Sequence, residues 1–109
     1  MSTPKPEIVL VTGGNTGIGY ETVKALLESP KSYHILLGSR SLPKAHTAIE
    51  RLKTEIPGLM NTVEALQVDL DSDESIEAAF ETVKKEHGVI DVLLNNAGWT
   101  QHFLGRNKS

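Results

Sequence analysis

Short apolar runs and helical patterns alternate along this chain, and the alternation restricts the fold more than any other feature. Strands are predicted at residues 8–12, 33–39, 63–69 and 90–95, where the runs are short and favour β-structure. The first, second and fourth runs are almost continuously apolar, as expected for strands that are covered on both faces. The pattern therefore predicts an α/β fold with a doubly wound parallel sheet, in which right-handed crossovers favour the strand order 3-2-1-4.

Three helices are predicted between these strands. The first spans residues 17–29 before Pro30, the second begins at about Pro43 and ends at Pro57, and the third spans residues 72–87. Their apolar faces are expected to consist of Ile18, Thr22, Ala25 and Leu26 in the first helix, Ala45, Ala48, Ile49, Leu52 and Ile56 in the second, and Ile76, Ala79, Phe80 and Val83 in the third. The first two helices should cover one face of the sheet and the third the other face, which leaves the last strand poorly covered with an open edge.

The composition excludes several classes of protein. A chain of 109 residues with 39% hydrophobic and 23% charged residues is expected to form one soluble globular domain. A net charge of -3 without a cluster of Lys and Arg argues against a nucleic-acid-binding protein. No cysteine is present, so disulfides and thiolate zinc sites are excluded. The apolar run at residues 8–11 is too short for a signal peptide or a membrane span, and the absence of such signals predicts a cytoplasmic protein.

A glycine-rich segment, TGGNTGIG at residues 12–19, connects the first predicted strand to the first predicted helix. Glycine suits this turn because the turn is tight and because a diphosphate can then approach the backbone closely. The start of the following helix presents free N–H groups to the phosphates. A P-loop would need Lys and then Ser or Thr after Gly19, but Tyr20 and Glu21 stand there, so ATP hydrolysis is not expected. The segment predicts a Rossmann-like dinucleotide site with contacts from Gly13, Asn15, Gly17, Ile18 and Gly19.

The end of the second predicted strand carries Ser39 and Arg40 where NAD-binding proteins place a carboxylate. That carboxylate would hold the ribose hydroxyls of NAD and repel a 2'-phosphate. Arg40 can pair with a 2'-phosphate instead, and Ser39 can donate a hydrogen bond to it. NADP is therefore predicted in preference to NAD, and the alternative is that Arg40 is an ordinary solvated arginine.

Three motifs, in their order and strand context, resemble the short-chain dehydrogenase/reductase family. They are the Gly-x-x-x-Gly-x-Gly spacing of the glycine segment, Asp69 at the end of the third predicted strand, and Asn95-Asn96-Ala97-Gly98 at the end of the fourth. The resemblance implies an NADP-dependent oxidoreductase acting on a carbonyl/alcohol pair. It implies that Asp69 with Leu70 lies against the adenine. It also implies that one segment supports both the sheet and the nicotinamide ribose, namely Asn95, Asn96, Ala97 and Gly98.

The resemblance places the family's catalytic serine, tyrosine and lysine on later elements, so no catalytic residue is predicted here. Tyr20 and Lys24 match the catalytic Tyr-x-x-x-Lys spacing, but they lie on the wrong helix and are expected on its surface. The chain is expected to be a truncated NADP-binding half-domain over residues 1–98 with a polar tail at 99–109, inactive alone and weakly stable. The family's dimer helices are not found in this sequence, so the oligomeric state is left open.

Two other functions fit the sequence less well. A noncatalytic NADP-binding sensor or partner module is the alternative, because the glycine segment is intact while a proton donor is missing. An S-adenosylmethionine methyltransferase is disfavoured, since its ribose site needs an acid where Ser39 and Arg40 stand.

Two further patterns resemble metal sites, and neither predicts one. Asp69, Asp71 and Asp73 imitate the start of a calcium loop but lack its later glycine and glutamate, so a helix start capped by Asp71 or Ser72 is expected. The four histidines, His34, His46, His87 and His102, share no ligand spacing.

Overall fold

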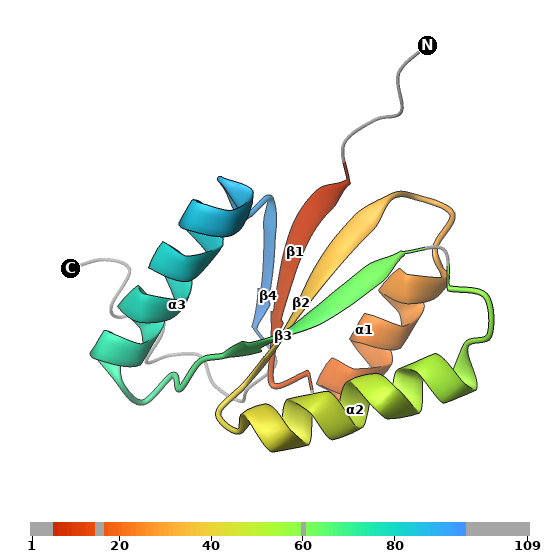
Figure 1. Cartoon of the computed structure of the whole chain (residues 1–109), viewed down its shortest axis with the longest axis horizontal. Coiled ribbons are helices and arrows are strands. Elements are labelled where there is room, and N and C mark those ends of the chain that lie inside the picture. Colours follow the sequence, from red (N-terminus) through yellow and green to blue (C-terminus); the bar gives the residue numbers. More distant parts are fainter. Residues whose placement is uncertain (1–5, 15–16, 60, 96–109) are drawn as a thin grey trace, which may run out of the picture.

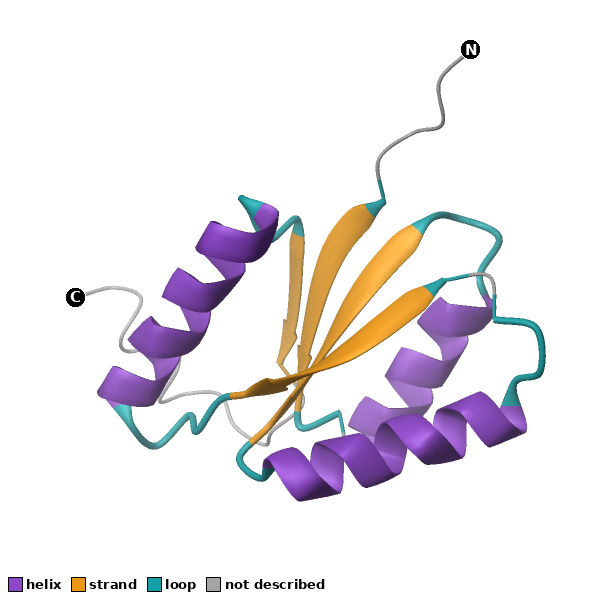
Figure 2. Cartoon of the chain, in the orientation of Figure 1, coloured by secondary structure: helices purple, strands orange, loops and turns teal. Residues whose placement is uncertain are grey.

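The computed structural model describes residues 6–14, 17–59 and 61–95, and these form a parallel sheet with helices on both faces (Figures 1 and 2). The elements in chain order are β1 (Glu7–Thr12), α1 (Gly17–Glu28), β2 (Tyr33–Ser39), α2 (Leu42–Glu55), β3 (Thr62–Gln67), α3 (Asp73–His87) and β4 (Val92–Asn95). The strand order is β3-β2-β1-β4, as predicted. None of the described helices is long and apolar enough to span a membrane.

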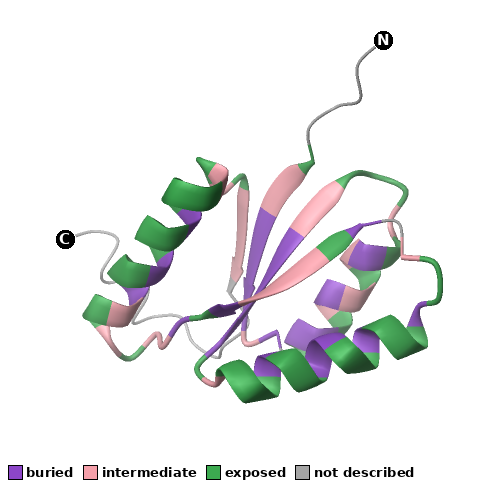
Figure 3. Ribbon diagram, viewed as in Figure 1, coloured by how far each residue is buried: buried purple, intermediate pink, exposed green. Residues whose placement is uncertain are grey.

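Side chains of the central strands alternate between two cores, because successive residues of a strand point to opposite faces. Val9 and Val11 of β1 belong to the core beneath α1 and α2, whereas Leu10 belongs to the core beneath α3. Ile35, Leu36 and Leu37 of β2 divide in the same way. Figure 3 shows the buried residues concentrated along the middle of the sheet and on the inner sides of the helices. The predicted placement of two helices on one face and one on the other is therefore confirmed.

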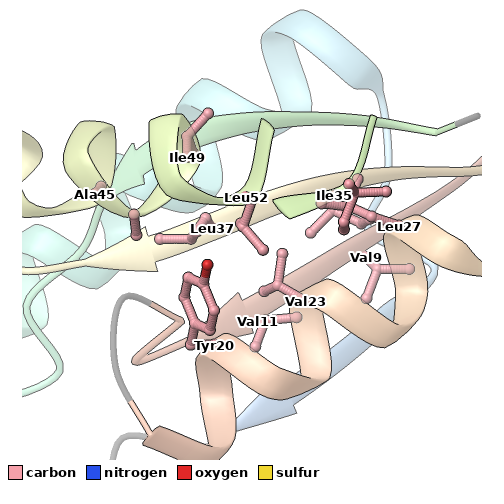
Figure 4. Packing of buried hydrophobic residues seen from close by; sticks show 12 residues of the cluster. Val9, Val11, Tyr20, Val23, Leu27, Ile35, Leu37, Ala45, Ile49 and Leu52 are labelled. Atoms are coloured by element: carbon pink, nitrogen blue, oxygen red, sulfur yellow. The ribbon is translucent and has the colours of Figure 1, made fainter. Parts of the chain in front are cut away.

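The predicted apolar face of α1 is wrong. The buried residues are Gly19, Tyr20, Val23 and Leu27 (Figure 4), while Ile18 is 76% exposed. The helix packs closely on the turn after β1 through Gly19, because a Cβ there would lie 2.1 Å from the Gly13 carbonyl oxygen. That contact turns the face with Tyr20 and Val23 inward. Ile18 and Ala25 are exposed, and Leu26 is half-buried at the side of the core.

Helices α2 and α3 lie as their sequence patterns indicate, with one exception. Ala45, Ala48, Ile49 and Leu52 of α2 are buried, as are Ile76, Ala79 and Val83 of α3. Ser41 and Ser72 cap the two helices with their side-chain oxygens. Gly88 ends α3 with φ of 91°, a conformation that favours glycine. The exception is Phe80, which is 38% exposed because it lies at the side of the α3 stripe.

Asn61 fixes the loop that joins α1 to β2. Asn61 is only 6% exposed, and its Oδ1 accepts a hydrogen bond from the Tyr33 N–H at 3.0 Å. Its Nδ2 lies 2.9, 3.2 and 2.9 Å from the carbonyl oxygens of Leu26, Ser29 and Lys31, so one of its two N–H groups is shared between two of these acceptors. One buried amide therefore binds backbone groups of α1, of the loop and of the first residue of β2.

The last strand is poorly covered, as predicted. Ile90, Val92, Leu93 and Leu94 are all half-buried, and β4 pairs only with β1 among the described residues. Asp91 secures the entry to β4, because its Oδ2 accepts a hydrogen bond from the Ile8 N–H at 2.8 Å. The third strand ends at Gln67, two residues before the predicted Asp69, and β4 begins at Val92 rather than at Ile90.

Candidate functional site

A crevice of about 470 Å³ opens where β1, β2 and β3 end. In Figure 1 these strand ends lie beside the start of α2, at the end of the molecule opposite the amino terminus. The lining residues are Thr12, Gly13, Ser39, Arg40, Ser41, Lys44, Val68, Asp69, Leu70 and Asp71. Ligands of doubly wound proteins bind outside the carboxyl ends of the strands, so the position favours a ligand site.

The turn after β1 consists of closely packed backbone. Gly13 has φ of 66°, which favours glycine, and Gly19 leaves no room for a side chain above the Gly13 carbonyl. The Gly14 N–H donates a hydrogen bond to the Gly38 carbonyl oxygen at 3.2 Å and ties the turn to β2. A Cβ at Gly14 would lie 2.9 Å from Leu37 Cγ. In its described part the turn consists of Gly13 and Gly14, so a ligand can approach that backbone closely.

The end of β2 and the start of α2 bring two cations to the crevice. Ser39 is buried, and its Oγ accepts a hydrogen bond from the Ser41 N–H at 3.2 Å. Ser41 Oγ in turn accepts from the Lys44 N–H at 3.3 Å. Arg40 and Lys44 both line the crevice beside the amino terminus of α2, which has no acidic residue in its first turn. Two positive side chains and a helix start favour an anion at this place.

The end of β3 supplies the opposite wall. The Asp69 N–H donates to Ser75 Oγ at 2.8 Å, and Asp69 Oδ1 accepts from the Asp71 N–H at 3.0 Å. These bonds hold the Asp69 carboxylate in a turn, and the capping of α3 falls to Ser72, one of the two residues that the sequence predicts. Asp71 Oδ2 lies 3.8 Å from Arg40 Nη1. Arg40 and Asp71 are 72% and 81% exposed, so their ion pair is weak and leaves Arg40 available to another anion.

The structure brings together five of the predicted cofactor-binding residues, namely Gly13, Ser39, Arg40, Asp69 and Leu70. Gly19 lies beneath them against Gly13. Gly17 and Ile18 do not line the crevice: they border a shallow hollow of about 800 Å³ on the outer side of α1. The backbone of Asn95 pairs with Thr12 at the end of β1. The predicted residues Asn15, Asn96, Ala97 and Gly98 lie outside the described residues, as does the predicted tail at 99–109.

Sequence reasoning missed five residues of the crevice as parts of the site, namely Thr12, Ser41, Lys44, Val68 and Asp71. Lys44 stands four positions after Arg40, in the first turn of a helix that begins at the ligand-binding end of the sheet. A basic residue at such a helix start is a usable signal for anion binding. Asp71 reaches Arg40 across the crevice only because β2 and β3 are neighbours, which local spacing does not reveal.

Tyr20 is not the surface residue that was expected. It is 3% exposed, and its hydroxyl donates a hydrogen bond to Glu55 Oε1 at 2.7 Å. Burial, together with that hydrogen bond, raises the pKa of Tyr20 to about 12. Lys24 Nζ also lies 3.6 Å from Glu55 Oε1. The hydrogen bond from Tyr20, aided by Lys24 and Arg51, lowers the pKa of Glu55. The Tyr-x-x-x-Lys pair therefore connects α1 to α2 through Glu55, and Tyr20 is part of the core shown in Figure 4.

Two of the histidines meet in space although their spacing in the sequence does not indicate it. His34 of β2 and His87 of α3 have ring centroids 4.8 Å apart, and both lie next to Glu64 of β3. This group lies near the starts of the strands, away from the crevice.

Several known proteins are similar to this chain in sequence. The family model described as short chain dehydrogenase matches residues 7–107. The short-chain dehydrogenase/reductase eupG of Phoma sp. is 46% identical over 100 residues, which are 90% of this chain and 36% of that protein. The short-chain dehydrogenase/reductase tropE of Talaromyces stipitatus is 42% identical over 92 residues, 84% of this chain and 35% of that protein. The chain thus spans about a third of the length of these relatives.

Solved structures agree with the sequence relatives. The L-sorbose reductase of Gluconobacter frateurii, complexed with NADPH and L-sorbose, superposes with a TM-score of 0.72 at 29% identity over 86% of this chain and 34% of that one. The menthone neomenthol reductase of Mentha piperita has a TM-score of 0.73 at 26% identity over 96% of this chain and 38% of that one. Both similarities extend over most of the described sheet and helices.

Proposed function

The chain belongs to the short-chain dehydrogenase/reductase family, and we propose that its crevice binds the adenosine and diphosphate portion of NADP(H). The observation that carries this proposal is the cationic lining at the end of β2. Arg40 and Lys44 border the crevice where a carboxylate would select NAD, and the residue beside them, Ser39, is neutral. The similar L-sorbose reductase is a complex with NADPH, which supports the same choice.

The glycine turn fits the diphosphate. A phosphate needs backbone N–H groups without intervening side chains, and Gly13, Gly14 and Gly19 leave that backbone bare. We expect the diphosphate to lie over the turn between β1 and α1, with contacts from Gly13, Asn15, Gly17, Ile18 and Gly19. The adenine is expected against Asp69 and Leu70, with the 2'-phosphate of its ribose beside Arg40. Asn95, Asn96, Ala97 and Gly98 are expected on the nicotinamide side, next to the end of β1.

NADPH bound in this way would supply the hydride for reduction of a carbonyl group. The whole-protein activity that we propose is therefore an NADP-dependent oxidoreductase that acts on a carbonyl/alcohol pair, as in the family at large. The residues of this chain bind and orient the dinucleotide, and Tyr20 takes no part in proton transfer, because it is buried against Glu55 with a pKa of about 12. A cytoplasmic location and a half-domain formed by residues 1–98 belong to the same proposal.

The decisive experiment compares NADPH and NADH binding by calorimetric titration of the wild-type chain and Arg40→Ala. A hydrogen bond to a charged group is worth about 1.5 to 3 kcal/mol, and Arg40 is exposed, so we expect NADPH affinity to fall about tenfold, at the low end of that range. NADH lacks the 2'-phosphate, and its affinity should stay unchanged. Lys53→Ala, which removes an exposed positive charge from the other end of α2, is the matched control and should leave both affinities unchanged.

Three results would contradict the proposal. Absence of saturable NADPH binding by a folded chain removes the cofactor assignment as a whole. Equal losses for NADPH and NADH in Arg40→Ala mean that Arg40 does not contact the 2'-phosphate. Equal losses in Arg40→Ala and Lys53→Ala mean that net charge alone decides affinity.

A further inference from the structure

His34, Glu64 and His87 come from three different elements and converge on one carboxylate oxygen. His34 Nε2 lies 2.8 Å from Glu64 Oε1, and His87 Nε2 lies 3.5 Å from the same atom. The three potential ligand atoms all lie within 4.8 Å of one another. His34 and Glu64 share a face of the sheet because Glu64 pairs with Leu36, two residues along β2, and α3 covers that face.

The donor set suits a borderline divalent metal ion. Two imidazoles and a carboxylate match the ligands that Zn²⁺ and similar ions take, with bonds of about 2.0 to 2.2 Å. Tetrahedral geometry at those bond lengths separates two ligand atoms by about 3.4 Å. The distance of 3.5 Å between His87 Nε2 and Glu64 Oε1 already has this value, and His34 has to move away from Glu64 by a fraction of an ångström.

His87 Nε2 has no hydrogen-bond partner among the described residues. The atom is buried, and it makes no hydrogen bond, because the Glu64 and Glu86 carboxylates at 3.5 and 3.9 Å are too distant or badly aligned. A buried nitrogen without a partner is costly, and coordination of an ion would satisfy it. The surroundings are partly buried rather than dry, since the side chains of His34 and His87 are 18% and 19% exposed.

A hydroxyl group lies behind one of the two histidines, and a groove leads to the group from solvent. His34 Nδ1 lies 2.6 Å from Thr62 Oγ1, so an imidazole that coordinates through Nε2 could donate its Nδ1 proton to that hydroxyl. Glu64 and Glu86 line a groove of about 400 Å³ between β3 and α3, through which an ion can enter.

We propose that His34, Glu64 and His87 form a zinc-class metal site, with three protein ligands and a fourth position for water. The site would join the start of β2, the middle of β3 and the last residue of α3. In Figure 1 the end of α3 and the starts of the strands lie at the same end of the molecule, opposite the crevice, so the metal would attach α3 to the sheet rather than take part in dinucleotide binding. The proposal is independent of the proposed function.

The test uses Co²⁺ as a spectroscopic probe on the metal-depleted full chain. Tetrahedral Co²⁺ with nitrogen and oxygen ligands gives visible d–d bands, and Zn²⁺ should displace it. We expect one saturable Co²⁺ ion per chain in the wild type and in His46→Gln, the control that removes an exposed histidine of α2. His87→Gln and Glu64→Gln should abolish the bands. Thr62→Val keeps all three ligands and should weaken binding by about 10- to 100-fold.

Each outcome decides the proposal. Far-ultraviolet circular dichroism shows whether a variant is folded, and if His87→Gln and Glu64→Gln unfold, Thr62→Val carries the test because its ligands are intact. Absence of tetrahedral bands in the folded wild type overturns the site. Binding that is unchanged in folded His87→Gln, or lost equally in His46→Gln, also overturns it. Unchanged affinity in Thr62→Val, when the ligand variants do not fold, overturns it as well.

Discussion

Replacement of Asn61 by Ala is expected to destabilise the fold by about 2 to 4 kcal/mol. The amide lies 2.9 to 3.2 Å from four backbone partners in α1, in the loop and in β2, two of which share one N–H, and the residue is only 6% exposed. Each bond contributes about 0.5 to 1.5 kcal/mol net, and a group left buried without a partner costs more. The loop is near the surface, so water can bind some of the freed backbone groups, and the expected loss is therefore smaller than four hydrogen bonds of full strength would give.

The measurement is the free energy of unfolding from urea denaturation followed by circular dichroism. Gln67→Ala is the matched control, because Gln67 is an exposed amide with one hydrogen bond of 3.2 Å, to the Arg40 carbonyl oxygen. It should cost about 0.5 kcal/mol or less. A loss below about 1 kcal/mol for Asn61→Ala, or equal losses for the two variants, would refute the view that this amide fixes the loop.

Three further substitutions test the crevice and its support. Gly19→Ala should abolish dinucleotide binding and destabilise the fold, because its Cβ would lie 2.1 Å from the Gly13 carbonyl oxygen; titration and urea denaturation measure the two effects. Tyr20→Phe should flatten the alkaline loss of stability: the pKa of Tyr20 is raised from 10.0 to about 12, so its hydrogen bond stabilises the fold below pH 10 and that contribution is lost as the pH rises through 12. Asp71→Asn should strengthen NADPH binding by up to about fivefold, because it removes a carboxylate from Arg40 and from the phosphate; a weaker complex would contradict this.

Each of these has a control on the same kind of residue. Gly14→Ala should be milder than Gly19→Ala, since its closest contact, at 2.9 Å, is the side chain of Leu37 rather than backbone. Tyr33→Phe should leave the alkaline profile unchanged, because no hydrogen bond ties that hydroxyl to Glu55. Glu77→Gln removes an exposed acid of α3 that does not line the crevice and should leave NADPH affinity unchanged. If a variant and its control have equal effects, the contact proposed for Gly19, Tyr20 or Asp71 does not explain the result.

The sequence predicts the sheet and the buried faces of α2 and α3 because each of these apolar patterns fits only one arrangement. In α2 and α3 the residues between the apolar positions are mostly charged, so only one face can be buried. Helix α1 has two apolar stripes, one with Ile18 and Leu26 and one with Val23 and Leu27, and periodicity does not choose between them. The choice depends on the contact of Gly19 with Gly13, which belongs to tertiary structure.

The site divides in a similar way. Ser39 and Arg40 were predicted because the end of the second strand faces the ribose in a doubly wound sheet, a rule that needs no side-chain detail, and Asp69 was predicted from the resemblance to the family. Lys44 and Asp71 depend on how α2 begins and on which carboxylate reaches Arg40. The group of His34, Glu64 and His87 depends on the register of β3 against β2 and on the length of α3. Register is set by packing of the whole sheet, and local spacing does not determine it.

The glycine turn and the core beneath α1 depend on one contact, which affects how binding experiments should be interpreted. The contact of Gly19 with Gly13 leaves the backbone bare for a diphosphate, and it also sets the rotation of α1 that buries Tyr20 against Glu55. A side chain at Gly19 would therefore disturb binding and folding together, and lost affinity in that variant does not identify a ligand contact. Arg40 is 72% exposed and packs in neither core, so loss of NADPH affinity in Arg40→Ala, with NADH affinity unchanged, isolates the phosphate contact from the fold.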